Sequence, residues 1–148
     1  MNIPDLLSMS VVLIYVISFT LYIITGNAIH FKALMGTIGT TLISETLKYF
    51  FIRDESVRPK GAKDCNLLCN DGNQSGRPGM PSSHSASVAF FSGYYFQQTT
   101  NNFIKILLVS YAGLIMMSRY VKECHTINQI VVGAILGLSL SWFAVRQL

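Results

Sequence analysis

The chain has 148 residues and a formal net charge of +4; 51% of its residues are hydrophobic and only 12% are charged. Soluble domains usually carry about twice that share of charge, so the composition excludes an ordinary soluble domain and predicts a membrane protein. The length allows one domain, residues 1–148. The small positive charge comes without a nucleic-acid-binding motif, so we expect no nucleic-acid partner.

The first apolar segment runs from Leu6 to Ile29 without a charged residue. Crossing ~30 Å of hydrocarbon takes about 20 helical residues. We therefore predict a first spanning helix over residues 6–26. Because the segment lacks a basic leader and is too long for a signal-peptide core, we expect the mature protein to keep it.

A second spanning helix is predicted over residues 31–52, after a short turn. It carries Glu45 and Lys48 three positions apart, on one helical face. A charge at the bilayer centre costs about 2.5–3.5 kcal/mol on an insertion scale. We therefore expect the pair either at the membrane interface, with its charges extended toward water, or against a polar cavity.

Residues 53–81 form a polar loop that holds three of the four prolines and several glycines. A loop of this length in a small protein is usually functional or disordered. Cys65 and Cys69 lie in it at C-x3-C spacing, without the further ligands that a zinc site needs. A disulfide between these two cysteines and a pair of free thiols both remain open.

Three further spanning helices are predicted, over residues 83–98, 103–120 and 126–145. The expected fold is therefore an all-α, polytopic membrane bundle of about five transmembrane helices. With five crossings, the loop at 53–81 and the segment at 118–125 emerge on the same side of the membrane. The turns near residues 26–32 and 97–102 and the C-terminus emerge on the other side.

The third predicted helix begins at Pro81-Ser82-Ser83-His84. Serine after proline is typical of a helix N-cap, and the first helical turn has unpaired N–H groups that attract anions. Such a helix end readily binds phosphate, and His84 would lie in that first turn. The alternative is an ordinary serine cap with a histidine at the membrane interface.

A second polar segment joins the last two predicted helices. Arg119 carries a planar, permanently charged guanidinium that matches phosphate oxygens. His125 follows, and Gln129 lies four residues later on the same helical face. A histidine whose second ring nitrogen is held by a neighbour is prepared for nucleophilic attack. Alternatively, Arg119 and Lys122 form a basic cap at a helix C-terminus or a membrane anchor, neither of which predicts His125 or Gln129.

Together, PSSH at 81–84 and SR-x5-H at 118–125 resemble two motifs of the type 2 phosphatidic acid phosphatase superfamily, PSGH and SR-x5-H-x3-D. The longer forms, GMPSSHS and HT-x2-Q, are most similar to the dolichyl diphosphate phosphatase branch, in which glutamine also replaces the aspartate. The remaining family motif, K-x6-RP, is imperfect, because nine residues separate Lys48 from Arg58. We expect the helix to end near Arg53 so that the loop brings Arg58 round; Arg77 is the alternative.

The resemblance implies a two-step hydrolysis through a phosphohistidine. His125 would attack phosphorus in line, while His84 would protonate the leaving oxygen and then activate water. Gln129 would orient the His125 ring. The phosphate ligands that the resemblance implies are Lys48, Arg58, Ser82, Ser83 and Arg119. The sequence has no clustered carboxylates for magnesium, so we expect catalysis without a metal or other cofactor.

The sequence therefore favours an integral membrane phosphatase that hydrolyses a lipid-linked phosphate or diphosphate, with polyprenyl or dolichyl diphosphate as the favoured substrate. A phosphatidate-type lipid phosphate phosphatase is the nearest enzymatic alternative. A catalytically silent lipid-binding or transport module of the same fold is the alternative outside enzymes. The expected partners are the lipid phosphate substrate and membrane lipids, and the sequence predicts no particular oligomeric state.

Two sequence patterns disagree about which side of the membrane the site of this multi-pass protein faces. The noncatalytic basic residues of the loop face indicate the cytosol by the positive-inside rule; they are Arg53, Lys60, Lys63, Arg77 and Lys122. The triplet Asn73-Gln74-Ser75 fits the N-glycosylation pattern and, with the resemblance, favours the lumen of the endoplasmic reticulum. Both orientations remain open at this point.

Overall fold

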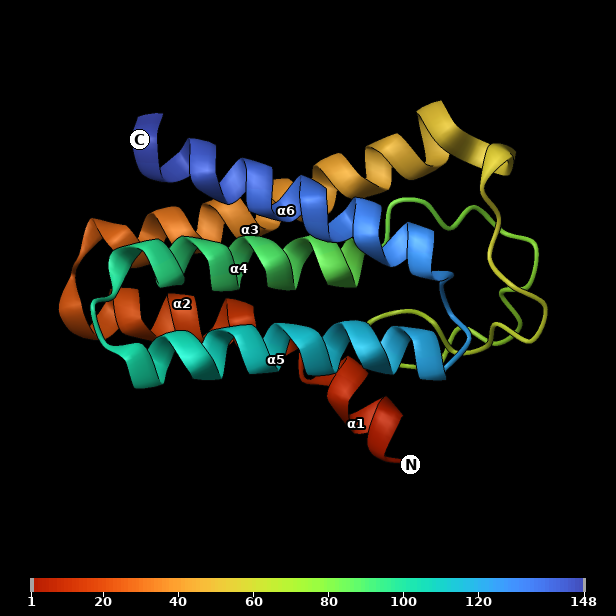
Figure 1. The fold of residues 1–148 in the computed structure, drawn as a ribbon, viewed down its shortest axis with the longest axis horizontal. Coiled ribbons are helices and arrows are strands. Elements are labelled where there is room, and N and C mark those ends of the chain that lie inside the picture. The colour runs from red at the N-terminus through yellow and green to blue at the C-terminus, as the bar shows by residue number, and fades with distance from the viewer. Residues whose placement is uncertain (1, 148) are drawn as a thin grey trace.

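The computed structural model describes residues 2–147, and in this range the chain is a helical bundle without a β-strand (Figure 1). Its α-helices are α1 (Ile3–Met9), α2 (Val12–Thr25), α3 (Ala28–Thr46), α4 (Ser83–Gln98), α5 (Asn102–Val121) and α6 (Ile127–Gln147). A π-helical turn, η1 (Leu47–Ile52), and a 3-10 turn, η2 (Arg53–Glu55), extend α3. The all-α membrane bundle predicted from the sequence is confirmed.

The central helix is α4, which packs against α3, α5 and α6. Two glycines of α6 allow the closest of these contacts. A Cβ at Gly137 would lie 2.1 Å from the carbonyl oxygen of Ala86, and a Cβ at Gly133 would lie 2.5 Å from that of Ser82. Small residues four positions apart let membrane helices approach closely. This contact holds the first half of α6 beside the first turns of α4.

The first apolar segment, predicted to span the membrane over residues 6–26, is long and apolar enough to do so over Ile3–Thr25, but its helix is interrupted. Helix α1 ends at Met9 and α2 begins at Val12, and Figure 1 shows α1 directed away from the axis of α2. Ser10 lies at the break, where its hydroxyl donates to the carbonyl oxygen of Leu7 at 2.7 Å and contacts the Tyr111 hydroxyl at 3.2 Å. A serine that bonds to nearby backbone competes with the regular helix and favours such a bend.

The second predicted helix, 31–52, begins earlier and changes character near its end. Asn27 caps α3 by accepting the backbone N–H of Ile29 at 2.9 Å. The α-helical hydrogen bonding ends at Thr46, and η1 continues as a π-turn that holds Lys48. Such π-turns often mark functional positions. The chain then leaves the helix at Arg53, which has a left-handed φ of 48°, close to the predicted end.

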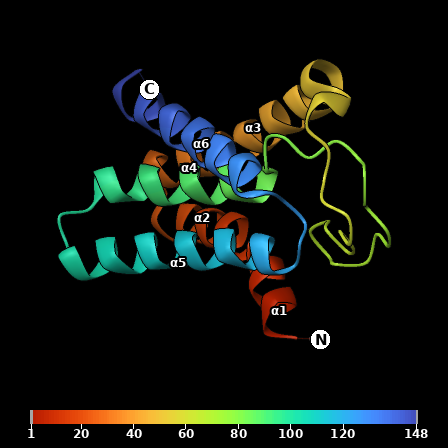
Figure 2. The same cartoon turned by 45° about the vertical axis from the view of Figure 1, so that its right-hand side comes forward.

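Both polar segments lie at one end of the bundle. Figures 1 and 2 show residues 56–82 and the α5–α6 connection at that end, with the α2–α3 and α4–α5 turns and the C-terminal end of α6 at the other. Two isolated bridges, Val57 with Pro78 and Lys63 with Asn73, fold the loop back on itself. The arrangement of chain ends and loops is the one that the crossing count predicts.

Three helical stretches between residues 2 and 147 are long and apolar enough to cross a membrane: Ile3–Thr25, Asn102–Val121 and Ile127–Gln147. Many of their large apolar side chains are exposed on the outside of the bundle, as lipid contact requires. Helix α4 has only 16 residues and is largely buried by its neighbours. The crossing of α3 and α4, and hence the count of five spans, stays a prediction.

Candidate active site

A cavity of about 340 Å³ lies between α2, the α3–η1 junction, α4 and the loop, where α6 begins. Five of the eight residues predicted for the site line it: Lys48, Arg58, Ser83, His84 and His125. The other three, Ser82, Arg119 and Gln129, are buried behind this lining. Residues separated by more than seventy positions thus meet at one cavity, because α4 and α6 start side by side.

His125 is held by Gln129. The Gln129 Oε1 lies 3.2 Å from the His125 Nδ1, while its amide nitrogen donates to the carbonyl oxygen of Val57 at 2.8 Å and to the Ser56 hydroxyl at 3.1 Å. Because the amide nitrogen is engaged by these oxygens, Oε1 must face the ring and accept the Nδ1 proton. The unprotonated Nε2 is then the nitrogen available for attack. A Cβ at Gly79 would lie 2.7 Å from this amide, so the loop needs glycine there.

The surroundings of His125 favour the neutral imidazole. Only 2% of the residue is exposed. Burial, followed by the nearby positive charges of Arg119, Arg58 and Lys48, holds the pKa of His125 well below its usual value, against the opposing effect of the hydrogen bond that its ring donates to Gln129. A neutral imidazole keeps the nitrogen lone pair that a nucleophile requires.

His84 lies in the first turn of α4, as predicted. Ser82 is the N-cap, and its hydroxyl accepts the N–H of Ser85 at 3.4 Å and the hydroxyl of Ser85 at 3.0 Å. The Ser82 N–H donates to the carbonyl oxygen of Gln129 at 3.0 Å, which ties the start of α4 to α6. The Nε2 of His84 is buried and has no hydrogen-bond partner. A buried polar atom of this kind needs a hydrogen-bond partner that the described residues do not supply.

Lys48 faces the cavity and is only 2% exposed, so of the two expectations for this residue the polar cavity is correct. Its ammonium lies 2.6 Å from the Glu45 Oε1 and 2.8 Å from the Ser83 hydroxyl oxygen. Ser83 in turn donates to the same Glu45 oxygen. The three side chains form one bonded group on a wall of the cavity.

The structure places Arg58 and not Arg77 at the cavity. Arg58 is 8% exposed, lines the cavity and has a buried Nη1 without a partner. Arg77 is exposed and supports Arg58 through its backbone, since its carbonyl oxygen accepts the Arg58 N–H at 2.8 Å. The end of the helix after η1 lets the loop return to the site, which accommodates the longer spacing from Lys48.

Arg119 is fully buried behind the cavity. Its guanidinium donates to the Ser8 hydroxyl and, at 2.5 Å, to the carbonyl oxygen of Cys65, whereas its Nε has no partner. It therefore contributes positive charge to the site and anchors both α1 and the loop.

The sequence of this chain is similar to those of known proteins. The family model described as the PAP2 superfamily matches residues 12–148. The chain belongs to the PAP2 superfamily. It is also 36% identical, over 87 aligned positions, to a protein named Dolichyldiphosphatase 1 from Rhinolophus ferrumequinum. That match covers 47% of this chain and 37% of the relative. No solved structure matches.

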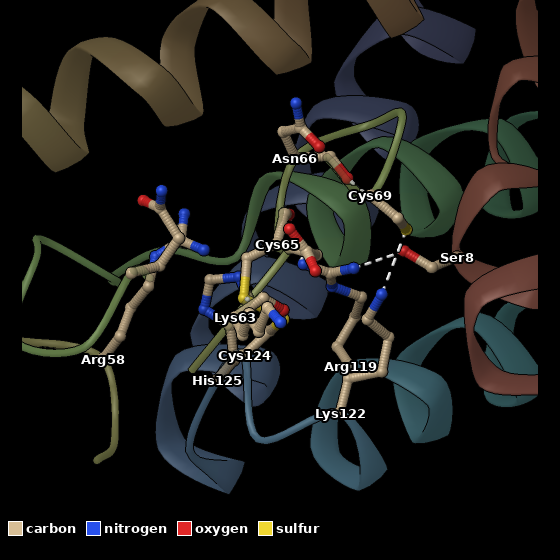
Figure 3. The surroundings of a disulfide bond; sticks show 12 residues. Ser8, Arg58, Lys63, Cys65, Asn66, Cys69, Arg119, Lys122, Cys124 and His125 are labelled. Atoms are coloured by element: carbon tan, nitrogen blue, oxygen red, sulfur yellow. Dashed lines mark hydrogen bonds between the residues drawn. A yellow bond between two sulfur atoms is a disulfide. The ribbon is translucent and has the colours of Figure 1, made fainter. Parts of the chain in front are cut away.

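The PAP2 site contains a disulfide that the sequence analysis did not foresee. Cys65 is bonded to Cys124, which precedes His125, so neither a Cys65–Cys69 bridge nor a pair of free loop thiols is correct (Figure 3). Cys69 is free, and its sulfur accepts the Lys122 ammonium at 3.0 Å. The two bonded cysteines lie 59 positions apart, with Cα atoms 5.5 Å apart, a common disulfide spacing. The only signal was an unassigned third cysteine beside the histidine motif.

Several hydroxyl groups of the PAP2 cavity were also missed. The Tyr15 hydroxyl lies 2.7 Å from the Thr41 hydroxyl, which lies 2.7 Å from the Ser87 hydroxyl, and all three residues line the cavity. Thr41 is one helical turn before Glu45, and Ser87 is one turn after Ser83. Extending the two known helical faces by four residues would have found both.

Proposed function

We propose that this PAP2 superfamily member is a membrane phosphatase that hydrolyses a lipid-linked phosphate or diphosphate. The observation that carries the proposal is the meeting of two histidines and two cationic side chains, Lys48 and Arg58, at one cavity at an end of a membrane bundle. A binding module needs positive charge but has no need of an oriented nucleophile and a second imidazole. Phosphoryl transfer depends on positioning and charge stabilisation, which such a cavity provides.

The proposed first step uses His125 as the nucleophile. Its Nε2 forms a bond to phosphorus while the bond from phosphorus to the leaving oxygen breaks, and His84 gives that oxygen a proton. In the second step His84 takes a proton from water, whose oxygen bonds to phosphorus as the bond to the His125 nitrogen breaks. The products are inorganic phosphate and the dephosphorylated lipid, or the lipid monophosphate when the substrate is a diphosphate.

The proposed phosphate ligands fall into two groups. Lys48, Arg58 and Ser83 reach the cavity directly. Ser82 contributes as the cap of the helix whose first N–H groups face the phosphate, and Arg119 contributes its charge and its unpartnered Nε. Gln129 acts through His125 by keeping its Nδ1 protonated.

The favoured substrate is a polyprenyl or dolichyl diphosphate. Support comes from the name of the relative, Dolichyldiphosphatase 1, and from the apolar outer surfaces of the helices, which suit a long lipid tail. The test is phosphate release in detergent from a panel that runs from diphosphorylated polyprenols to phosphatidate. Preference for phosphatidate would indicate the phosphatidate-type alternative. Binding of these lipids by the intact protein, with no more phosphate release than His125→Ala gives, would indicate a silent module.

We propose that the site faces an oxidising compartment, such as the lumen of the endoplasmic reticulum. The Cys65–Cys124 disulfide supports this orientation over the cytosolic one, because cytosolic thiols are kept reduced. Asn73 is exposed on the same face. Expression in a eukaryotic host should therefore give a glycosidase-sensitive mass shift that Asn73→Gln abolishes. A glycosylated C-terminal tag would contradict the orientation.

We further propose that catalysis needs no metal ion. The cationic side chains at the cavity would supply the charge that magnesium supplies in other phosphoryl-transfer enzymes. Phosphate release should persist in excess chelator. Loss of activity that added magnesium restores would refute the proposal.

A further inference from the structure

Glu45 is a carboxylate on the wall of the cavity proposed to bind phosphate, and 40% of its side chain is exposed. It belongs to the last turn of α3, and it lines the cavity with Lys48 and Ser83. A single oxygen, Oε1, accepts both the Lys48 ammonium, at 2.6 Å, and the Ser83 hydroxyl. Lys48 is almost fully buried, so its charge has little access to water.

Two other polar side chains of the cavity wall differ from this pair. The Nη1 of Arg58 and the Nε2 of His84 are buried and have no partner. Lys48 and Ser83, in contrast, are already bonded to an anionic oxygen. Of the three proposed phosphate ligands that reach the cavity, Lys48 and Ser83 are thus occupied by the carboxylate, and Arg58 has an Nη1 open for a ligand.

We propose that Glu45 is a specificity-determining residue that occupies Lys48 and Ser83 in the empty site and must release them when a phosphate group binds. This inference rests on the proposed function, because it takes these two side chains as phosphate ligands. The carboxylate oxygen stands where a phosphate oxygen would accept the same two hydrogen bonds. An incoming phosphate must therefore compete with a built-in anion.

Competition with the Glu45 carboxylate most weakens the binding of anions that carry little charge or make few other contacts with the protein. A lipid diphosphate has a second phosphate group and a lipid tail to compensate, whereas inorganic phosphate has neither. The carboxylate therefore discriminates against free phosphate and shortens the time for which the product stays bound. Glu45→Gln removes the negative charge, keeps the side-chain shape and leaves Lys48 free to pair with phosphate.

Asp71 offers a matched control. It is a second carboxylate in the cavity lining, but its Oδ1 accepts backbone N–H groups, from Cys65 at 2.6 Å and from Asn66 at 3.3 Å. Asp71→Asn removes the same charge and keeps an oxygen that can accept those bonds. A general effect of net charge on anion binding would appear in both variants, whereas competition for Lys48 and Ser83 is specific to Glu45.

The experiment measures the Kd for inorganic phosphate by titration calorimetry in detergent, on the full chain and on both variants. We expect Glu45→Gln to bind phosphate at least about tenfold more tightly than the unmodified chain, a change of 1.4 kcal/mol, and Asp71→Asn to match the unmodified chain. Unchanged or weaker binding by Glu45→Gln, or equal tightening in both variants, would overturn the proposal. Glu45→Ala should also tighten binding, which guards against misfolding of one variant.

Because the titration needs no turnover, it separates this inference from the proposed function. Tighter phosphate binding by Glu45→Gln, without phosphate release from any lipid by the unmodified chain, would retain the role of Glu45 and reject the phosphatase. Phosphate release from lipids with no change in Kd would retain the phosphatase and reject the role of Glu45. When both hold, Glu45→Gln should also show stronger product inhibition by phosphate.

Discussion

The Cys65–Cys124 disulfide gives a sharp prediction about the nucleophile. The bond joins the loop to the residue before His125, and the carbonyl oxygen of Cys65 accepts the Arg119 guanidinium. Breaking the bond therefore frees one end of the nucleophile segment and one contact of a buried cation. We expect Cys124→Ser to lower both thermal stability and phosphate release.

The magnitude follows from the length of the closed loop. For cysteines 59 positions apart, the chain-entropy relation gives about 4 kcal/mol of stabilisation. This value is a ceiling, because α4 and α5 lie within the loop and remain helical in the membrane. If about a third of this free energy serves to hold His125 in its reactive position, losing it raises the barrier enough to lower kcat/KM about tenfold.

The assay is phosphate release from a lipid diphosphate, with and without reductant, together with thermal unfolding in detergent. Reductant should inhibit the unmodified enzyme and have no further effect on Cys124→Ser. Cys69→Ser is the matched control, since Cys69 has a free thiol in the same loop, and it should keep activity and reductant sensitivity. Unchanged activity and melting temperature in Cys124→Ser would refute the reasoning.

Three further predictions concern the nucleophile. Gln129→Leu should lower kcat by about 10²–10⁴-fold, because the His125 Nδ1 loses its acceptor and the carbonyl oxygen of Val57 loses its donor. Gln129→Glu keeps an acceptor and should lose less activity; equal, mild losses in both variants would place Gln129 outside the site. The pKa of His125 is held well below its usual value, so the imidazole stays neutral as pH falls through 6.5. The fall of kcat/KM on the acid side should therefore lie below that pH, and a fall that begins above it would contradict the assignment of His125 as the nucleophile. Arg58→Gln should move this fall to higher pH by removing a nearby positive charge, whereas Arg77→Gln should leave it in place.

The parts of the site that the sequence predicted are those set by local spacing. His125 and Gln129 are one helical turn apart, and Ser82 begins the helix that carries His84, so helix geometry alone relates the members of each pair. The joining of the two pairs at one cavity required a count of membrane crossings. That count of five stays a prediction, because among the described residues hydropathy identifies three of the spans and not those of α3 and α4.

The parts that were missed depend on contacts between distant segments. The Cys65–Cys124 bond and the sharing of Ser83 by Glu45 and Lys48 bring together residues that no spacing rule relates. The break at Ser10 and the π-turn at Lys48 are departures from ideal helices inside apolar or mixed segments. Hydropathy reports that such a segment can be helical, but it does not report where the hydrogen bonding changes.

The most direct test of the account is to trap the phosphoenzyme from a substrate labelled on its terminal phosphate, by rapid quench into alkali. The account predicts a protein-bound label that is stable in alkali and labile in acid, as expected of a phosphohistidine, in the unmodified enzyme and none in His125→Ala. His84→Ala should hold more label than the unmodified enzyme when the substrate has a good leaving group, because the activation of water is lost. Label retained in His125→Ala would contradict the central claim that this imidazole attacks phosphorus.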